Sequence, residues 1–310
     1  MAPKTRSRKK RAEFRLPAAW LLLLLVLLGA VVALRLRLTH RPAVSAPPTP
    51  PASAPPPSPP SPAPRLRREP SRPPGRPSVP EPPPLFREGE AAVSLVLDDT
   101  GQSLDLAEEA AARLPRSVTF AVIPYLPASR SSAERLHALG FPVILHAPME
   151  PLDGRRWRAS GGMLLGGMGK EEVRRILLGD LGEVPYAEGV NNHMGSRATQ
   201  DRALMAAVME VLSERGLYFL DSRTTPLTVA YDEARAAGVP TAFRSVFLDG
   251  EDEGGAIMAQ LDSLVDRSRR EGVLVGIGHL RPRTVEALAA RIPYWSRRGV
   301  RFVPLREVVR

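Results

Sequence analysis

The sequence of residues 88–310 predicts an α/β fold, in which the strands of a parallel sheet alternate with helices. Short apolar runs recur along this part of the chain, and segments with the spacing of amphipathic helices separate them. Repeated units of this kind build a parallel sheet that is either doubly wound or closed as a barrel. The first apolar run leads into DDTGQS, which lacks the GxGxxG pattern of dinucleotide-binding sheets. The barrel is therefore preferred.

Seven segments have the length and composition of strands, and two of the intervening segments carry clear helix signals. The strands are expected at residues 93–97, 118–123, 142–145, 217–220, 245–248, 273–277 and 300–303. One helix is expected from Ser103 to about Arg113. Another is expected between Thr199, which can cap its first turn, and Gly216, which can stop it.

Acidic, amide and histidine side chains follow the apolar runs, at the points where the strands should end. They are Asp98, Asp99, His146, Asn191, Asn192, His193, Asp221, Asp249 and His279. In a parallel barrel the carboxyl ends of the strands meet at one mouth, so these side chains should converge there. Three of the chain's five histidines are in this set, whereas His40 falls in a proline-rich segment and His137 in a predicted helix. The pattern indicates an enzyme site, with a capping role as the alternative for Asp221 and Asp249.

These residue types match the needs of a metal-dependent hydrolase. A catalytic zinc typically has three protein ligands from His, Asp or Glu, and Asp99, His146 and His193 satisfy that count. Asp98 fits the role of a general base, and His279 fits that of an acid which protonates a leaving amine. Glu150, in the sequence HAPME, is an alternative ligand that would pair with His146.

The N-terminal segment predicts a membrane anchor. Seven basic residues within positions 1–15 precede an uncharged stretch at 16–34. A helix of that length rises about 28 Å, close to the roughly 30 Å of a bilayer's hydrocarbon core. The excess of positive charge on the amino side favours an N-in orientation. We expect a single-pass protein of the inner, or cytoplasmic, membrane with residues 88–310 in the periplasm; a signal peptide cleaved near residues 44–46 is the alternative.

Residues 35–87 separate this anchor from the domain and are expected to be disordered. The stretch 42–84 holds 20 of the chain's 34 prolines, a composition that favours an extended spacer without a core. Residues 1–87 also hold 16 of the 43 Lys and Arg residues but three of the 33 acidic residues. The net charge of +10 therefore comes from the leader, and the slightly acidic domain is not expected to bind nucleic acid.

At the same residues the chain resembles the divergent polysaccharide deacetylase family, a branch of the NodB-like carbohydrate esterases. The matching segments are LVLDDTG at 95–101, VTFAVIP at 118–124, HAPMEP at 146–151, GVNNHMGSRAT at 189–199, FLDSRTT at 219–225, FRSVFLD at 243–249 and GIGHL at 276–280. The resemblance implies a distorted α/β barrel of seven or eight strands with a site for a divalent metal. By analogy with the wider superfamily, it makes Asp98 the base, Asp99, His146 and His193 the metal ligands, and His279 the acid.

The activity that this resemblance implies is removal of N- or O-acetyl groups from an envelope or exported polysaccharide, such as peptidoglycan, with zinc as the expected metal. Asn192, Asp221 and Arg223 lie in the matching segments and are predicted to contact the substrate. Two departures favour a different function. Position 150 is Glu where related enzymes have the second histidine of an HxxxH pair, and Leu280 stands where this branch prefers proline. The alternative is a catalytically weak glycan-binding or envelope-assembly protein that uses the same barrel mouth.

Overall fold

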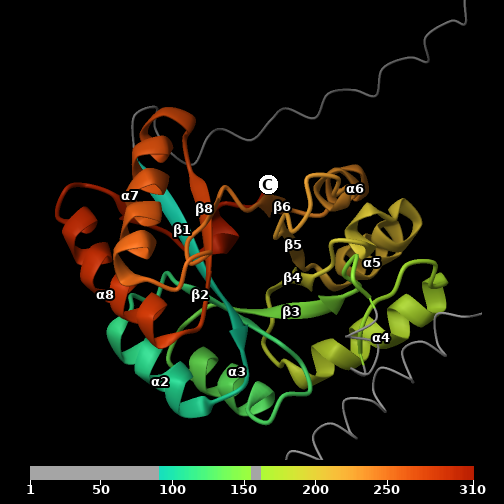
Figure 1. Ribbon diagram of the computed structural model, residues 1–310. Helices are drawn as coiled ribbons and strands as arrows, with labels where there is room; N and C mark the ends of the chain where they lie inside the picture. Colours follow the sequence, from blue (N-terminus) through green and yellow to red (C-terminus); the bar gives the residue numbers. More distant parts are fainter. Residues whose placement is uncertain (1–90, 155–161) are drawn as a thin grey trace, which may run out of the picture. The chain divides into compact units, whose positions relative to one another are not determined.

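The computed structural model describes residues 91–154 and 162–310, in which nine strands alternate with seven α-helices (Figure 1). The strands are β1 (Ala92–Thr100), β2 (Thr119–Val122), β3 (Val143–Met149), β4 (Gly189–Met194), β5 (Tyr218–Asp221), β6 (Thr241–Phe243), β7 (Val246–Phe247), β8 (Leu274–His279) and β9 (Arg301–Phe302). The helices are α2 (Leu104–Arg113), α3 (Ser129–Ala138), α4 (Lys170–Glu183), α5 (Arg202–Arg215), α6 (Ala230–Ala237), α7 (Gly254–Glu271) and α8 (Pro282–Ser296). Each of the seven predicted segments overlaps a strand, and β4 and β6 are additional.

Eight of the strands form one parallel sheet that curls into a half-barrel. Their order across the sheet is β6-β5-β4-β3-β2-β1-β8-β7, and β9 pairs with the first residues of β1. The outermost strands, β6 and β7, are consecutive in the chain and are joined by Arg244 and Ser245 alone. Because the step from Phe243 to Val246 covers at most about 11 Å, the two edges of the sheet lie close together. The α/β prediction is confirmed, and the curled sheet is consistent with the expected distorted barrel.

The two faces of the sheet contribute to separate cores, since successive strand residues point to opposite sides. On β1, Leu95 belongs to the larger core between sheet and helices, whereas Val96 belongs to the smaller core inside the curl. Leu305, near the C-terminus, is buried in that inner core, and the backbone of Arg310 pairs with that of Thr241 at the start of β6. The C-terminal segment thus covers the amino ends of the strands, and the carboxyl ends form the mouth.

The helices lie side by side on the outer face of the curl (Figure 1). Neighbouring helices pack in pairs: α5 contacts both α4 and α6, α7 contacts α8, and α2 contacts both α3 and α8. This layer buries the apolar stripes that the helical spacing in the sequence predicts.

The helix signals in the sequence are partly confirmed. Ser103 is the N-cap of α2, and Gly216 ends α5 in the left-handed conformation with a φ of 64°. The assignment of Thr199 as the cap of α5 is wrong. Asp201 has that role, and its carboxylate accepts from the backbone N–H of Leu204 at 3.1 Å. Thr199 lies in a 3₁₀ turn that precedes the helix and is buried.

The predicted basic tail (1–15), transmembrane segment (16–34) and proline-rich linker (35–87) lie outside the described residues, as does His40. Within residues 91–154 and 162–310, every helix is too short or too polar to cross a bilayer. The predicted deacetylase-like domain, 88–310, includes all of the described residues.

Asp180, on α4, is a buried carboxyl group in the helical layer. It has no exposed surface, and neither of its oxygens makes a well-aligned hydrogen bond. It packs against Gly162 and Tyr125, since a Cβ atom at Gly162 would approach the Asp180 carboxyl to 2.5 Å and the Tyr125 ring to 2.6 Å. Burial raises the pKa of Asp180 to about 8, against the smaller opposing effect of the Tyr125 hydroxyl. The folded protein therefore keeps this group mostly protonated at neutral pH.

The free energy of unfolding of the wild type should fall as the pH rises, because Asp180 is protonated in the folded protein. We expect Asp180→Asn to lack this fall. The unfolded chain releases this proton near pH 4, whereas the folded protein keeps it until about pH 8. The free energy of unfolding of the wild type therefore falls between these two values. From the low to the high end of this pH range, the free energy of unfolding of the variant should rise relative to that of the wild type by on the order of 5 kcal/mol. Unfolding measured at several pH values, with the exposed Asp266→Asn as control, tests this; parallel profiles would contradict it.

Candidate active site

The carboxyl ends of β1, β3, β4 and β8 bring the predicted catalytic and metal-binding residues together. Asp98 on β1 is level with His279 on β8, and His146 on β3 is level with Asn191 on β4. His193 lies two residues further along β4. Because these strands are parallel members of one curled sheet, their ends open onto the same mouth.

Asp98 and Asp99 are consecutive residues, yet both approach this mouth. Regular strand geometry would direct them to opposite faces of the sheet. The pairing of β1 with β2 is irregular between Leu97 and Thr100, and Asp99 has a φ of 60°, in the left-handed region. As a result, oxygens of Asp98 and Asp99 lie 3.6 Å and 3.4 Å from His146 Nε2.

Asp99, His146 and His193 form a compact group of potential metal ligands. Asp99 Oδ1 lies 3.4 Å from His146 Nε2 and 3.2 Å from His193 Nδ1, and the two ring nitrogens are 3.1 Å apart. One ligand atom from each residue lies within 4.8 Å of the others. Asp99 Oδ1 is buried and accepts no well-aligned hydrogen bond, which is costly for a carboxylate unless a cation is near. The donor set therefore fits a divalent metal such as zinc.

A chain of hydrogen bonds orients His146 toward the other two residues. Asn191 Nδ2 donates to Asp98 Oδ1 at 2.8 Å, so Asn191 Oδ1 is left to accept from His146 Nδ1, also at 2.8 Å. With the proton on Nδ1, the lone pair of His146 Nε2 faces Asp99 and His193. Asn191 thus supports a ligand, a role that its position in the sequence does not reveal.

His279 is held by a carboxylate that follows β7. Asp249 Oδ1 accepts from His279 Nδ1 at 3.0 Å, while Asp249 Oδ2 accepts from the His279 backbone N–H and the Thr284 hydroxyl, both at 2.7 Å. His279 Nε2 is left facing the group of potential metal ligands, 3.7 Å from Asp99 Oδ2. Burial lowers the pKa of His279, but the contact with Asp249 outweighs it, and the pKa is raised. This imidazole is suited to hold a proton.

Electrostatic surroundings distinguish the two adjacent carboxylates. Burial raises the pKa of Asp98, although His146 and the hydrogen bond from Asn191 act against it. Burial would also raise the pKa of Asp99, but the imidazoles of His146 and His193 outweigh burial and hold that pKa well below its usual range. Asp99 is therefore an anion at any ordinary pH, as a metal ligand must be.

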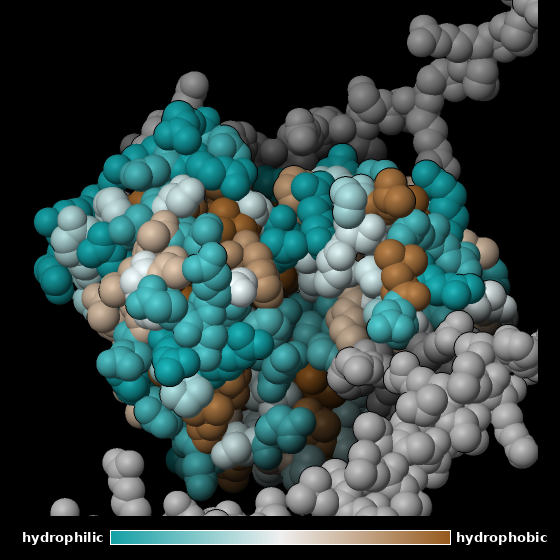
Figure 2. All heavy atoms as spheres, in the orientation of Figure 1, coloured by the Kyte–Doolittle hydropathy of each residue, from teal (hydrophilic) through white to brown (hydrophobic). Residues whose placement is uncertain are grey.

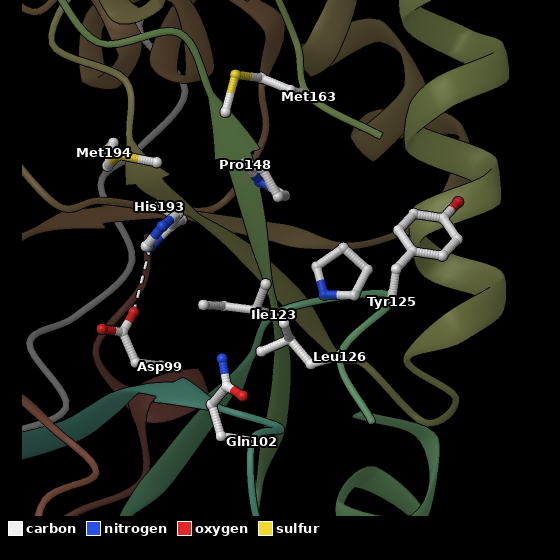
Figure 3. Close-up of a pocket in the computed structure, with 10 residues that line it drawn as sticks. Asp99, Gln102, Ile123, Tyr125, Leu126, Pro148, Met163, His193 and Met194 are labelled. Atoms are coloured by element: carbon white, nitrogen blue, oxygen red, sulfur yellow. Dashed lines mark ion pairs between the residues drawn. The ribbon is translucent and has the colours of Figure 1, made fainter. Parts of the chain in front are cut away.

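Two pockets adjoin these residues. One, of about 320 Å³, is lined by Asp98, His146, His193 and His279, together with Asn192, Met194, Ser222, Thr224, Arg244, Phe247 and Ile277. The other, of about 490 Å³, also includes His193, adds Asp99, and has a mostly apolar wall (Figure 3). Mostly hydrophilic residues cover the face of the domain shown in Figure 2, with apolar patches between them.

The three predicted substrate-contact residues lie in two different places. Asn192 lines the 320 Å³ pocket, and its amide is bonded to backbone groups of β4 and of the segment after β5. Asp221, which is buried, and Arg223, which is exposed, line a third pocket of about 540 Å³. Arg244 lines both this third pocket and the 320 Å³ pocket. The third pocket is therefore adjacent to the one that contains Asp98 and His279.

Glu150, the alternative ligand, is directed elsewhere. Its Oε2 accepts from the backbone N–H of Gly166 at 2.9 Å and lies 3.6 Å from Arg197 Nε. Among the described residues, the group of potential ligands contains Asp99 and the two histidines but not Glu150. Glu150 instead holds the loop that follows β3.

We expect Glu150→Ala to destabilise the protein without changing its metal content. The variant leaves the Gly166 N–H without its acceptor, which typically costs about 1–3 kcal/mol. Denaturant unfolding and elemental analysis of the same samples measure both effects. Asp153→Ala, at an exposed acidic residue of the same loop, is the control and should change neither. Loss of metal from Glu150→Ala with stability unchanged would make Glu150 a ligand after all.

Two known proteins are more than one third identical to this chain over the residues that align. A protein of Escherichia coli K12, the uncharacterized protein YibQ, is 36% identical over 196 residues, which cover 63% of this chain and 60% of that protein. An uncharacterized protein of Haemophilus influenzae Rd is 35% identical over 206 residues, or 66% of this chain and 72% of that one. The chain thus matches about three fifths of the length of the first relative.

The fold and the family are also shown. The crystal structure of the uncharacterized protein ATU2773 from Agrobacterium tumefaciens C58 superposes with a TM-score of 0.67 at 24% identity, covering 70% of this chain and 88% of that one. This likeness shows the fold. The family model described as divergent polysaccharide deacetylase matches residues 95–309, well over half of the chain. The chain therefore belongs to the divergent polysaccharide deacetylase family.

Proposed function

We propose that this protein is a metal-dependent hydrolase that removes acetyl groups from an envelope or exported polysaccharide, such as peptidoglycan. The observation that supports this most strongly is that Asp98 and His279 line one pocket beside the group Asp99, His146 and His193. Hydrolysis of an amide or ester needs a base and an acid that reach the same acyl group. Membership of the family supports a polysaccharide as the substrate.

The proposed ligand atoms are Asp99 Oδ1, His146 Nε2 and His193 Nδ1, with zinc as the preferred ion. Three protein ligands from His and Asp leave a position for substrate, as in other catalytic zinc sites. The chemistry that such an ion supplies when bound is Lewis acidity, which polarises an acyl carbonyl and acidifies water.

Asp98 is proposed to take a proton from the attacking water. Its Oδ1 accepts from Asn191, so Oδ2 is the oxygen available for the transfer. Burial raises the pKa of Asp98, which makes its carboxylate a stronger base than an exposed one. As the proton passes to Oδ2, the water oxygen forms its bond to the acyl carbon.

His279 is proposed to protonate the leaving atom of the sugar. Its Nδ1 is engaged with Asp249, so Nε2 is the nitrogen that faces the reacting group. When the bond between the acyl carbon and the sugar nitrogen or oxygen breaks, the Nε2 proton passes to that atom and acetate is released. Asp249 stabilises the charged imidazole until then and keeps the ring in one orientation.

The sugar that carries the acetyl group is proposed to occupy the 320 Å³ pocket, with Asn192 in its wall. The next sugar of the polymer would lie in the 540 Å³ pocket, beside Asp221 and Arg223. Arg244 lines both pockets, which supports a continuous path for the chain between them.

Acetate release tests the proposal directly. Full-length, metal-loaded protein is incubated with chitin oligomers, peptidoglycan and acetylated xylan, and acetate is measured together with binding to each glycan. The hydrolase releases acetate from at least one of them. A protein that binds one of the glycans and releases no acetate from any would instead be a glycan-binding or envelope-assembly protein.

We also propose that the chain is anchored in the inner membrane with its N-terminus inside the cell and residues 88–310 outside the cytoplasm. The basic residues of 1–15 and the apolar stretch 16–34 support this orientation. Protease added to spheroplasts should cut within 35–87 and leave an N-terminal tag protected. A domain that resists protease until the cells are lysed would contradict the proposal.

A further inference from the structure

The 490 Å³ pocket is the second cavity beside the metal-ligand group, and its wall is mostly apolar. It shares Asp99 and His193 with that group, and Ile123, Leu126 and Met163 are part of the remaining wall. In Figure 3, Asp99 and His193 lie at one end of these side chains and Tyr125 lies at the other. The pocket thus extends from the proposed reaction centre toward α4.

The two proton-transfer residues place this pocket on the acyl side of the reaction. Asp98 and His279 line the 320 Å³ pocket, and neither lines the 490 Å³ pocket. The leaving atom of the sugar must face the proton donor, His279, so the sugar lies in the smaller pocket. The other substituent of the acyl carbon then points away from the sugar, and the larger pocket is the space that remains beside Asp99 and His193.

The size and chemistry of the pocket suit an aliphatic chain. A volume of about 490 Å³ is within the roughly 300–1,000 Å³ of pockets that hold whole small molecules, and an acetyl group would leave most of it empty. The methionine side chain adapts to flexible apolar groups, and the leucine and isoleucine side chains add apolar surface. A sugar ring would bury several hydroxyls here, and beyond Asp99 and His193 the polar side chains of this wall are those of Gln102 and Tyr125.

Tyr125 lies at the far end of the pocket and packs closely against α4 and Gly162. Tyr125 has a φ of 62°, in the left-handed region, and its ring fits against two glycines. A Cβ atom at Gly162 would come within 2.6 Å of the ring, and one at Gly179 within 3.0 Å of the hydroxyl. The buried carboxyl of Asp180 adjoins the same ring. Tyr125 therefore forms one end of the pocket wall, although 52% of the residue is exposed to solvent.

We propose that this pocket binds the acyl chain of the substrate and that the protein removes linear acyl groups longer than acetyl. This inference rests on the proposed hydrolase function, which assigns the acid and the base. Each methylene buried in an apolar pocket contributes up to about fourfold in binding. Hexanoyl groups should therefore be removed with a kcat/KM at least tenfold above that for acetyl groups on the same sugar.

The kinetic test uses full-length, metal-loaded protein and chitosan oligomers that carry acetyl, butyryl or hexanoyl groups. Ile123→Trp fills the pocket and should lower the ratio of hexanoyl to acetyl kcat/KM at least tenfold. Leu152→Trp, at a residue that is 66% exposed and lies outside the pocket, should keep the wild-type ratio. Acetyl hydrolysis with no gain from longer chains, or an unchanged ratio in a folded Ile123→Trp variant, would overturn the proposal.

A binding test does not depend on turnover. Full-length protein with ¹³C-labelled methionine methyl groups is titrated with acetate and with hexanoate, and Met163→Leu assigns the Met163 signal. Hexanoate should shift this signal and acetate at equal concentration should not. A shift without hydrolysis of any glycan would support the pocket and reject the hydrolase function. Acetyl hydrolysis without a shift would reject the pocket alone, and the absence of both would reject both proposals.

Discussion

Asp98→Asn is expected to lose most acetate release while the metal stays bound. The amide has nearly the size of the carboxylate and its oxygen can still accept from Asn191, so the fold and the orientation of His146 should persist. It cannot take a proton from water, and general acid–base catalysis typically contributes roughly 10² to 10⁴ fold. The measurements are the rate of acetate release and the metal content of the same preparation.

Asp99→Ala is the matched comparison for Asp98→Asn, because the two residues are adjacent but have different proposed roles. It removes a ligand atom and should lose metal and activity together. If Asp98→Asn kept the wild-type rate at neutral pH, or if it lost metal as Asp99→Ala does, Asp98 would not be the general base.

His193→Ala is expected to remove most of the bound metal. The wild type should hold about one equivalent of zinc per chain, and loss of one of three protein ligands should weaken binding by at least the roughly 10- to 100-fold that second-shell changes cost. His193 is partly exposed, with 22% of its side chain accessible, so the truncation leaves little buried space to collapse. Elemental analysis after dialysis measures the effect.

His137→Ala provides the control for this loss. His137 lies on α3, as the sequence predicts, and its ring stacks on Tyr186 at 4.0 Å, away from the metal-ligand group. The variant should retain its metal. Equal metal content in His193→Ala and His137→Ala would remove His193 from the site.

The strands that the sequence predicts are those with continuous apolar runs, and the two that it misses lack them. β4 contains Asn191, Asn192 and His193, whose polar side chains hide the strand although the first two are almost fully buried. They are tolerated because each amide finds hydrogen-bond partners in the fold. β6 has three residues, too few for a periodic pattern to be recognised.

The sequence predicts which residues lie at the strand ends, but it does not predict how their side chains are arranged. The strand-end rule places Asp98, His146 and His279 at one mouth, and the structure does the same. Asp99 reaches that mouth because its own backbone is in the left-handed conformation, which secondary-structure propensities do not predict. For Asp249 the sequence left two roles open, one in the site and one as a cap. The hydrogen bond between Asp249, after β7, and His279, at the end of β8, identifies it as the partner of that histidine.

The position of β1 within the sheet has a consequence for how the domain folds. This strand is made first, yet it pairs with β8 and β9, which are made last. Closing so long a loop costs conformational entropy before the stabilising contacts between the strands form. This cost makes folding slow. Until β8 is available, apolar residues of β1 stay uncovered and prone to aggregate. A chain that ended before β8 would therefore depend on chaperones rather than form a smaller stable domain.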